Sequence, residues 1–216
     1  MPRRLKVDPS AAAPMVLQEA LAILRQGGVV AYPTDTVYGL AVDALNADAV
    51  ARLYAVKKRP QEKAVPLIIS GLEQLSQLAA PLSCAAKRMV TVFWPGPLTL
   101  LLPAHAQAPQ YLLSAGRRIG VRWPQVALSQ QLAAGLGGAI TATSANLAGC
   151  PVALSASEVV AQLASTIDLV LDGGVVQSSQ VSTILDVSVY PPRLIRAGRL
   201  SAQEIEAACG HTIVQD

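Results

Sequence analysis

The chain has 216 residues, of which 52% are hydrophobic and only 14% are charged. This composition supplies enough apolar surface for a large buried core, so it excludes an intrinsically disordered chain. Lysine and arginine together number 17 against 14 aspartate and glutamate residues, a formal net charge of +3. That charge is too small to indicate, by itself, a protein that coats nucleic acid.

Hydropathy and cysteine usage favour a cytoplasmic protein without a membrane partner. No stretch reaches the roughly 18 to 20 uninterrupted apolar residues of a membrane-spanning helix, and no apolar segment typical of a signal peptide follows the basic start. Cys84, Cys150 and Cys209 lie far apart in the sequence and match neither a disulfide framework nor a zinc motif. Two histidines, His105 and His211, leave few candidates for a histidine-based metal centre or a Ser-His-Asp triad.

Helical and strand patterns alternate along the chain, which predicts a mixed α/β fold. Helical spacing and capping residues predict helices at about 16–25, 46–58 and 127–136, with two more between 72 and 93. Further helices begin at the Ser-x-x-Glu capping boxes 155–158 and 201–204. Strand patterns occur at 29–32, 66–70, 98–102, 119–123, 139–143, 168–171, 182–187 and 193–196. No long linker divides these segments, so we expect one domain over residues 1–216, although the pattern does not give the strand order.

Three groups of basic residues adjoin the ends of predicted helices and strands. They comprise ten of the seventeen lysines and arginines: Lys57, Lys58, Arg59, Lys63, Arg117, Arg118, Arg122, Arg193, Arg196 and Arg199. If these ends converge, the groups make one positive cleft suited to a polyphosphate or a carboxylate. Three separate solvated patches are the alternative, and composition leaves the two arrangements equally open.

Hydroxyl side chains also gather at predicted strand ends. Thr34 and Thr36 follow the first strand, residues 141–146 include Thr141, Thr143, Ser144 and Asn146, and Ser182 with Thr183 opens a later strand. Ligands of α/β sheets commonly bind at strand ends, where such groups donate to phosphate oxygens or hold a small polar substrate. Turn and capping chemistry is the alternative for any one of these residues taken alone.

Several familiar catalytic motifs are absent from the sequence. It contains no Walker loop, no Gly-x-Gly-x-x-Gly after the first strand and no Gly-x-Ser-x-Gly elbow. An ATP site would therefore be of another kind. Positioning and electrostatic stabilisation remain as the means of catalysis.

Seven short motifs occur in order along the chain, at residues 27–40, 57–60, 94–99, 120–124, 143–146, 182–183 and 196–198. In this order they closely resemble the YrdC family of threonylcarbamoyl-AMP synthases, over a core of about residues 15–206. The resemblance implies the short, single-domain form of the family. Its fold would be a twisted mixed α/β sheet with flanking helices and a concave basic cleft.

The resemblance implies an ATP-dependent nucleotidyltransferase. L-threonine and bicarbonate would form an N-carboxylated amino acid, whose carboxylate attacks the α-phosphate of ATP and releases pyrophosphate. The product, threonylcarbamoyl-AMP, would pass to a separate threonylcarbamoyl transferase complex that modifies adenosine 37 of tRNA. Mg²⁺ would enter with ATP, and no direct protein ligand to the metal is expected.

The resemblance also assigns roles to individual residues. The catalytic set around the triphosphate would be Lys57, Arg59, Ser144 and Asn146, and Arg118 and Arg196 would complete the ATP site. Threonine would be held by Thr36, Arg122 and Ser182, with Thr34 as an alternative to Thr36. The chain departs from many relatives at Ser70, where they have histidine, and near Lys63, where its loop is about two residues longer. Whether Ser70 or Lys63 contributes to the site is left open.

Two other functions compete with this interpretation. A basic concavity suits double-stranded RNA or tRNA, so the protein could be a binding module without chemistry. Its aromatic residues, only 4% of the chain, supply a poor platform for stacking the bases of single-stranded RNA. A paralogue with the same pocket could instead make a different carbamoyl-adenylate, as in hydrogenase maturation.

Overall fold

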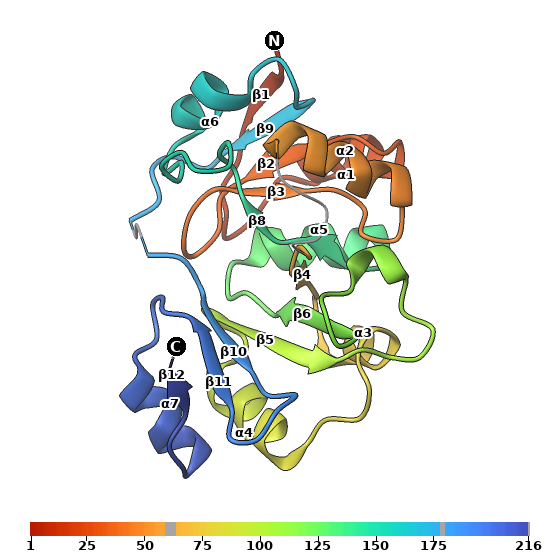
Figure 1. Cartoon of the computed structure of the whole chain (residues 1–216). Coiled ribbons are helices and arrows are strands. Elements are labelled where there is room, and N and C mark those ends of the chain that lie inside the picture. Colours follow the sequence, from red (N-terminus) through yellow and green to blue (C-terminus); the bar gives the residue numbers. More distant parts are fainter. Residues whose placement is uncertain (59–63, 178–179, 216) are drawn as a thin grey trace.

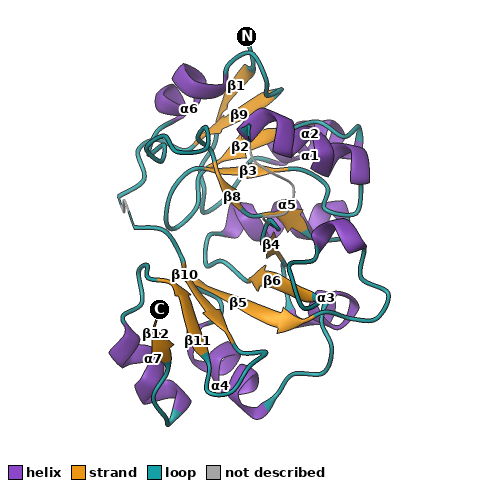
Figure 2. Ribbon diagram, viewed as in Figure 1, coloured by secondary structure: helices purple, strands orange, loops and turns teal. Residues whose placement is uncertain are grey.

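The computed structural model describes residues 1–58, 64–177 and 180–215, and their strands form two sheets. A five-stranded sheet that begins at the N-terminus lies at the top of Figure 1, and a seven-stranded sheet lies below it. Helices pack on the outside of both sheets (Figure 2). The mixed α/β class is therefore confirmed, with the strands divided between two hydrogen-bonded sheets.

The five-stranded sheet has the order β1-β9-β2-β3-β8. Its strands are β1 (Arg3–Lys6), β9 (Leu169–Asp172), β2 (Val30–Tyr32), β3 (Gly39–Ala41) and β8 (Thr143–Ser144). β9 runs parallel to both β1 and β2, whereas β3 is antiparallel to β2 and β8. Ala31 faces the core formed with helices α2 (Ala47–Lys57) and α6 (Ala156–Leu163). Val30 and Tyr32 face the opposite side, toward α1 (Pro14–Arg25) and α5 (Ala127–Leu136), as the two-residue repeat of a strand requires.

The seven-stranded sheet has the order β12-β11-β10-β5-β6-β4-β7. Its strands are β12 (Val214–Gln215), β11 (Arg193–Arg196), β10 (Thr183–Asp186), β5 (Leu98–Pro103), β6 (Arg118–Arg122), β4 (Leu67–Ile68) and β7 (Ile140–Thr141). Helices α3 (Leu72–Leu78), α4 (Cys84–Phe93) and α7 (Ala202–Cys209) belong to this half, together with a short 3₁₀ helix at Gln110–Leu112. None of the helices in the described ranges is long and apolar enough to cross a membrane.

The two sheets meet at the segment that contains β7 and β8. β7 belongs to the lower sheet and β8 to the upper one, and Ala142 separates them. Ala142 belongs to neither strand, and its N–H donates to the Pro66 carbonyl oxygen at 2.6 Å. Because one segment joins both sheets, it carries Thr143 and Ser144 into the space between them.

The predicted elements agree with the structure where local signals are strong. The Asn46 carboxamide oxygen caps α2 by accepting the N–H groups of Asp48 and Ala49, both at 3.1 Å. Ser201 and Glu204 form the predicted reciprocal capping box. At the other predicted box, Ser155 caps α6, but Glu158 accepts the N–H of Leu154 instead of closing the box. The predicted strand at 139–143 is divided into β7 and β8.

Candidate functional site

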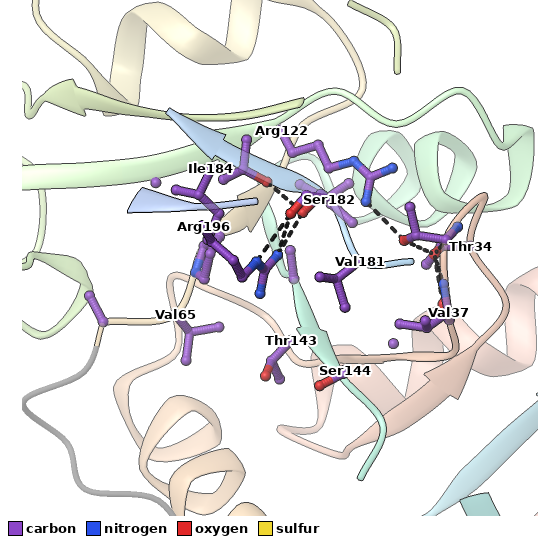
Figure 3. Close-up of a pocket in the computed structure, with 18 of the residues that line it drawn as sticks. Thr34, Val37, Val65, Arg122, Thr143, Ser144, Val181, Ser182, Ile184 and Arg196 are labelled. Atoms are coloured by element: carbon purple, nitrogen blue, oxygen red, sulfur yellow. Dashed lines mark hydrogen bonds between the residues drawn. The ribbon is translucent and has the colours of Figure 1, made fainter. Parts of the chain in front are cut away.

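A cavity of about 570 Å³ lies between the two sheets (Figure 3). The upper sheet contributes the ends of β2, β3 and β8, and the lower sheet contributes β4, β5, β6, β10 and β11. Eight of the ten predicted site residues line it: Thr34, Thr36, Lys57, Arg122, Ser144, Asn146, Ser182 and Arg196. Its volume is within the range of sites for nucleotide-sized ligands. The hydroxyl and basic groups that the sequence places at separate strand ends therefore converge on one cavity.

Thr34 and Thr36 form a compact turn after β2. The Thr34 hydroxyl donates to the Val37 carbonyl oxygen at 2.6 Å and accepts the N–H groups of Thr36 and Val37. The hydrogen-bonding capacity of this hydroxyl is largely used within the turn, as is typical of a threonine side chain that bonds to nearby backbone groups. The Thr36 hydroxyl lies 3.0 Å from that of Thr34 and is buried at the cavity wall. Of the two hydroxyls, Thr36 is the better placed to meet a ligand.

Arg122, the last residue of β6, lines the cavity and contacts the turn that follows β2. Its Nε donates to the Gly96 carbonyl oxygen at 2.9 Å, and its Nη1 donates to the Thr36 hydroxyl at 3.2 Å. Nη2 forms an ion pair with Asp35 Oδ1 at 2.6 Å. Burial lowers the pKa of Arg122, and the nearby Asp35 carboxylate opposes that shift. The guanidinium is thus held in one orientation with its positive charge at the cavity wall.

Ser182 and Arg196 also line the cavity and are hydrogen-bonded to each other. Figure 3 shows the Arg196 side chain directed at Ser182, where its Nη2 donates to the carbonyl oxygen at 2.7 Å and to the hydroxyl at 2.9 Å. The Ser182 hydroxyl also lies 3.0 Å from that of Thr99 on β5. Gly198 packs against this segment so closely that a Cβ there would lie 2.5 Å from the Val181 carbonyl oxygen. Because Gly198 has no side chain, it can pack against the backbone of the segment that carries Ser182.

Lys57 ends α2 beneath the loop that follows β8. Its ammonium donates to the Ser144 carbonyl oxygen and, at 2.8 Å, to that of Asn146. The side chain is only 4% exposed, yet it lines the cavity. The Asn146 amide donates to the Cys150 carbonyl oxygen at 2.7 Å, which fixes the loop further. One lysine thus both fixes the loop that carries Ser144 and Asn146 and places a cation beside it.

The remaining predicted residues differ in their placement. Arg59 and Lys63 lie outside the described residues. Arg118 forms an ion pair with the buried Asp186 and is not among the described residues that line the cavity, so its role near the phosphates stays a prediction. Ser70 also lies outside the lining, and its backbone N–H donates to the Gln74 Oε1 atom at 2.8 Å.

Three polar residues at or beside the cavity were not predicted as functional: Tyr32 and Thr99 line it, and Asp35 is bound to Arg122 of its lining. Each falls inside a motif that the sequence contains, and Asp35 stands between the two predicted threonines. Motifs in the sequence therefore marked these residues, but some of their partners are distant in the sequence: Asp35 and Arg122 are 87 positions apart. Thr99 is placed by its pairing with Ile184 in the parallel ladder of β5 and β10.

The described side chains give the cavity a positive character. Lys57, Arg122 and Arg196 of its lining contribute three cations, and Arg122 is paired with the Asp35 carboxylate beside the cavity. Within the described ranges, no group of three or more His, Cys, Asp or Glu side chains could hold a metal ion. Such a cavity suits an anionic ligand, with hydroxyl and amide groups available to fix its oxygens.

Comparison with known proteins identifies similar sequences. A family model described as "Telomere recombination", covering Sua5, YciO and YrdC proteins, matches residues 22–198. The threonylcarbamoyl-AMP synthase of Halorhodospira halophila is 39% identical over 165 residues, which cover 76% of this chain and 86% of that protein. The synthase of Pyrococcus abyssi is 36% identical over 191 residues, 88% of this chain and 56% of that protein. The chain thus spans about half the length of this relative, and equally of the one from Bacillus subtilis.

Solved structures show the same architecture. P. abyssi Sua5 complexed with L-threonine superposes with a TM-score of 0.92 at 33% identity, covering 98% of this chain and 62% of that one. E. coli YciO superposes with a TM-score of 0.86 at 26% identity, covering 95% of this chain and 100% of that one. The arrangement of two sheets is therefore shared with proteins of this kind.

Proposed function

Because the chain belongs to the Sua5/YciO/YrdC family, we propose that it makes threonylcarbamoyl-AMP and pyrophosphate from L-threonine, bicarbonate and ATP. One observation carries the proposal: two sets of side chains line a single positively charged cavity. The hydroxyl and arginine groups suit an amino acid, and the lysine, serine and asparagine suit a triphosphate. A reaction between two anionic substrates needs this juxtaposition, because charge repulsion otherwise keeps them apart.

The amino acid would bind beside Thr36, Arg122 and Ser182. A guanidinium has five N–H donors, and three of those on Arg122 are used by Gly96, Thr36 and Asp35. One N–H on each terminal nitrogen has no partner within the described residues, so a carboxylate can accept both. Ser182, directly before β10, lines the same cavity and is hydrogen-bonded to Arg196. These groups support a site for a small zwitterion with a hydroxyl side chain.

The triphosphate would bind beside Lys57, Ser144 and Asn146, with Arg59 as a further cation. The carbamate oxygen would attack the α-phosphorus while the bond to the bridging oxygen of pyrophosphate breaks. Lys57 would offset the charge that develops on the phosphate oxygens, and Ser144 and Asn146 would fix those oxygens without adding charge. The scheme requires no protein nucleophile. Arg196 would contact the nucleotide from β11.

Mg²⁺ would enter as part of the ATP substrate. The nearby Asp35 carboxylate is already paired with Arg122, so protein ligands for the ion are scarce within the described residues. Mg²⁺ commonly keeps several waters and binds substrate phosphates. Phosphate oxygens and water would therefore supply its coordination, and the ion would neutralise the charge of the leaving pyrophosphate.

The product is a mixed anhydride, which reacts readily with water and with amines. We infer that a separate threonylcarbamoyl transferase complex consumes it to modify adenosine 37 of tRNA in the cytoplasm. Direct binding of tRNA or double-stranded RNA at the positively charged cavity is an accompanying proposal, since its cations also suit a phosphate backbone.

The test is pyrophosphate release from ATP and Mg²⁺ in bicarbonate buffer with L-threonine, with L-serine and without an amino acid. Release that depends on threonine, together with threonylcarbamoyl-AMP detected by mass spectrometry, is the expected result. Release without threonine would instead indicate a different carbamoyl-adenylate. No release of pyrophosphate, combined with salt-sensitive binding of double-stranded RNA, would indicate that the protein is an RNA-binding module and not an enzyme.

A further inference from the structure

Tyr32 lines the cavity, and its hydroxyl is buried without a hydrogen-bond partner within the described part of the chain. Tyr32 is the last residue of β2, and its side chain is 0% exposed. Burial raises the pKa of this hydroxyl, so it is neutral and able to donate a proton to an acceptor. An unsatisfied buried hydroxyl is unfavourable, and a partner supplied by a ligand would remove that cost.

The sheet register locates this hydroxyl between the two halves of the cavity. Tyr32 pairs with Gly39 on β3, and Gly39 pairs in turn with Ser144 on β8. A Cβ built on Gly39 would lie 3.2 Å from Tyr32 Cζ and 3.3 Å from the hydroxyl oxygen. The ring therefore lies across Gly39, where there is no side chain, and extends toward the strand that carries Ser144.

Charged groups near the hydroxyl indicate what it would bind. Both Arg122 and Asp35 are close enough to influence its proton affinity, in opposite directions. Asp35 is paired with Arg122, whereas Arg122 retains N–H donors that have no partner within the described residues. A neutral O–H beside such a guanidinium complements an anionic oxygen.

We propose that the Tyr32 hydroxyl donates a hydrogen bond to a carboxylate oxygen of the bound acceptor, either threonine itself or the carbamate formed on it. The inference rests on the proposed function and extends it to a residue outside the predicted site. Tyr32 would help to hold the acceptor at the junction between Arg122 and the Ser144 side, where the carbamate meets the phosphate.

The test compares Tyr32→Phe with Tyr38→Phe. Both remove one buried hydroxyl and keep the ring, but the Tyr38 hydroxyl donates to the Gly174 carbonyl oxygen at 2.8 Å and accepts the Gly173 N–H at 3.1 Å. Tyr32→Phe deletes an atom without a protein partner within the described residues, so its unfolding temperature should be unchanged or higher. Tyr38→Phe should unfold at a lower temperature, because it leaves two backbone groups unpaired.

Substrate binding should show the opposite pattern. Tyr32→Phe should weaken acceptor binding by about tenfold or more, the usual effect of losing one hydrogen bond to a charged group, and Tyr38→Phe should leave it unchanged. Calorimetry with threonine alone detects a bond to the carboxylate of threonine. A raised KM for bicarbonate with unchanged threonine affinity would assign the bond to the carbamate. Unchanged values in both measurements, or a fall in stability without any change in binding, would overturn the proposal.

Measurements on the wild-type protein distinguish a failure of this inference from a failure of the proposed function. If wild type neither binds threonine nor releases pyrophosphate with it, the proposed function fails, and the role of Tyr32 fails with it. If wild type is active and Tyr32→Phe matches it in both binding measurements, only the role of Tyr32 is rejected.

Discussion

Asp35 and Arg122 form a buried ion pair beside the cavity, with 2.6 Å between Asp35 Oδ1 and Arg122 Nη2 and side chains that are 10% and 6% exposed. Asp35 follows β2 of the upper sheet, and Arg122 ends β6 of the lower sheet. The pair therefore links the two sheets directly at the proposed threonine site. It also holds the guanidinium in place before a ligand arrives, which lowers the cost of ordering the site on binding.

Asp35→Asn should destabilise the protein by about 3 kcal/mol, because it leaves a buried guanidinium without a countercharge. Urea unfolding measures this change. Arg3→Gln is the control, since it breaks the exposed Arg3–Glu19 pair and should cost less than about 1 kcal/mol. Similar losses in the two variants would mean that the Asp35–Arg122 pair contributes no more than a surface pair.

Arg122→Lys should raise the KM for threonine by about tenfold or more and change the KM for ATP much less. Lysine keeps the charge but loses the planar fork that can bind a carboxylate through two N–H groups. Steady-state kinetics with each substrate varied in turn provides the measurement. Arg117→Lys, an exposed arginine outside the cavity, is the matched control. A larger change in the KM for ATP would mean that the two halves of the pocket are assigned the wrong way round.

Lys57→Met should lower the rate of pyrophosphate release by about tenfold or more, because it removes a cation from the proposed triphosphate site. Methionine keeps much of the length and apolar stem of the buried lysine. The adjacent Lys58 is exposed, so Lys58→Met should retain near-normal turnover. Circular dichroism shows whether both variants keep the fold. Equal turnover in the two folded variants would contradict the role of Lys57.

Local sequence signals predicted the elements that position the site. The Asn46 cap defines the start of α2, whose last residue is Lys57, and β11 occupies the predicted residues 193–196. The motifs at strand ends converge on one cavity, as the resemblance implied. These features depend on residues that are close in the sequence, so short patterns are sufficient to indicate them.

Long-range partners explain what the sequence did not reveal. β1 is a charged segment, Arg3–Lys6, that becomes a strand only because β9 pairs with it, and no alternation of apolar and polar residues marks it. β3 and β12 are likewise short. β3 pairs with β8, which lies far along the chain, and β12 pairs with β11. The Asp35–Arg122 pair joins residues 87 positions apart. A single sequence does not specify such pairings, since many partners have compatible chemistry.

Asp168→Asn should destabilise the protein at neutral pH but have less effect in acid. Burial acts to raise the pKa of Asp168, but hydrogen bonds from Arg52 and the Val29 N–H outweigh it and hold the pKa below its ordinary value. The carboxylate therefore contributes stability above its unfolded pKa, near 3.9, and loses it as the pH falls through the lower folded pKa. Urea unfolding at pH 7 and at pH 2 to 3 tests this. A constant difference between variant and wild type would exclude titration of Asp168 as the cause.

Gly198→Ala should weaken threonine binding through a change in the backbone alone. The new Cβ would lie 2.5 Å from the Val181 carbonyl oxygen and 2.6 Å from backbone atoms of Ser182 and Thr183, so the segment that carries Ser182 must move. Overpacking of this kind costs about 1–3 kcal/mol of stability.

The matched control for this backbone effect is Gly138→Ala, where the nearest atom, on Leu45, would be 3.5 Å from the new Cβ, an ordinary contact. Thermal unfolding and threonine calorimetry on both variants separate the two sites. We expect Gly198→Ala to lose stability and threonine affinity together and Gly138→Ala to keep both. Wild-type affinity in a destabilised Gly198→Ala protein would show that the position of Ser182 does not determine threonine binding.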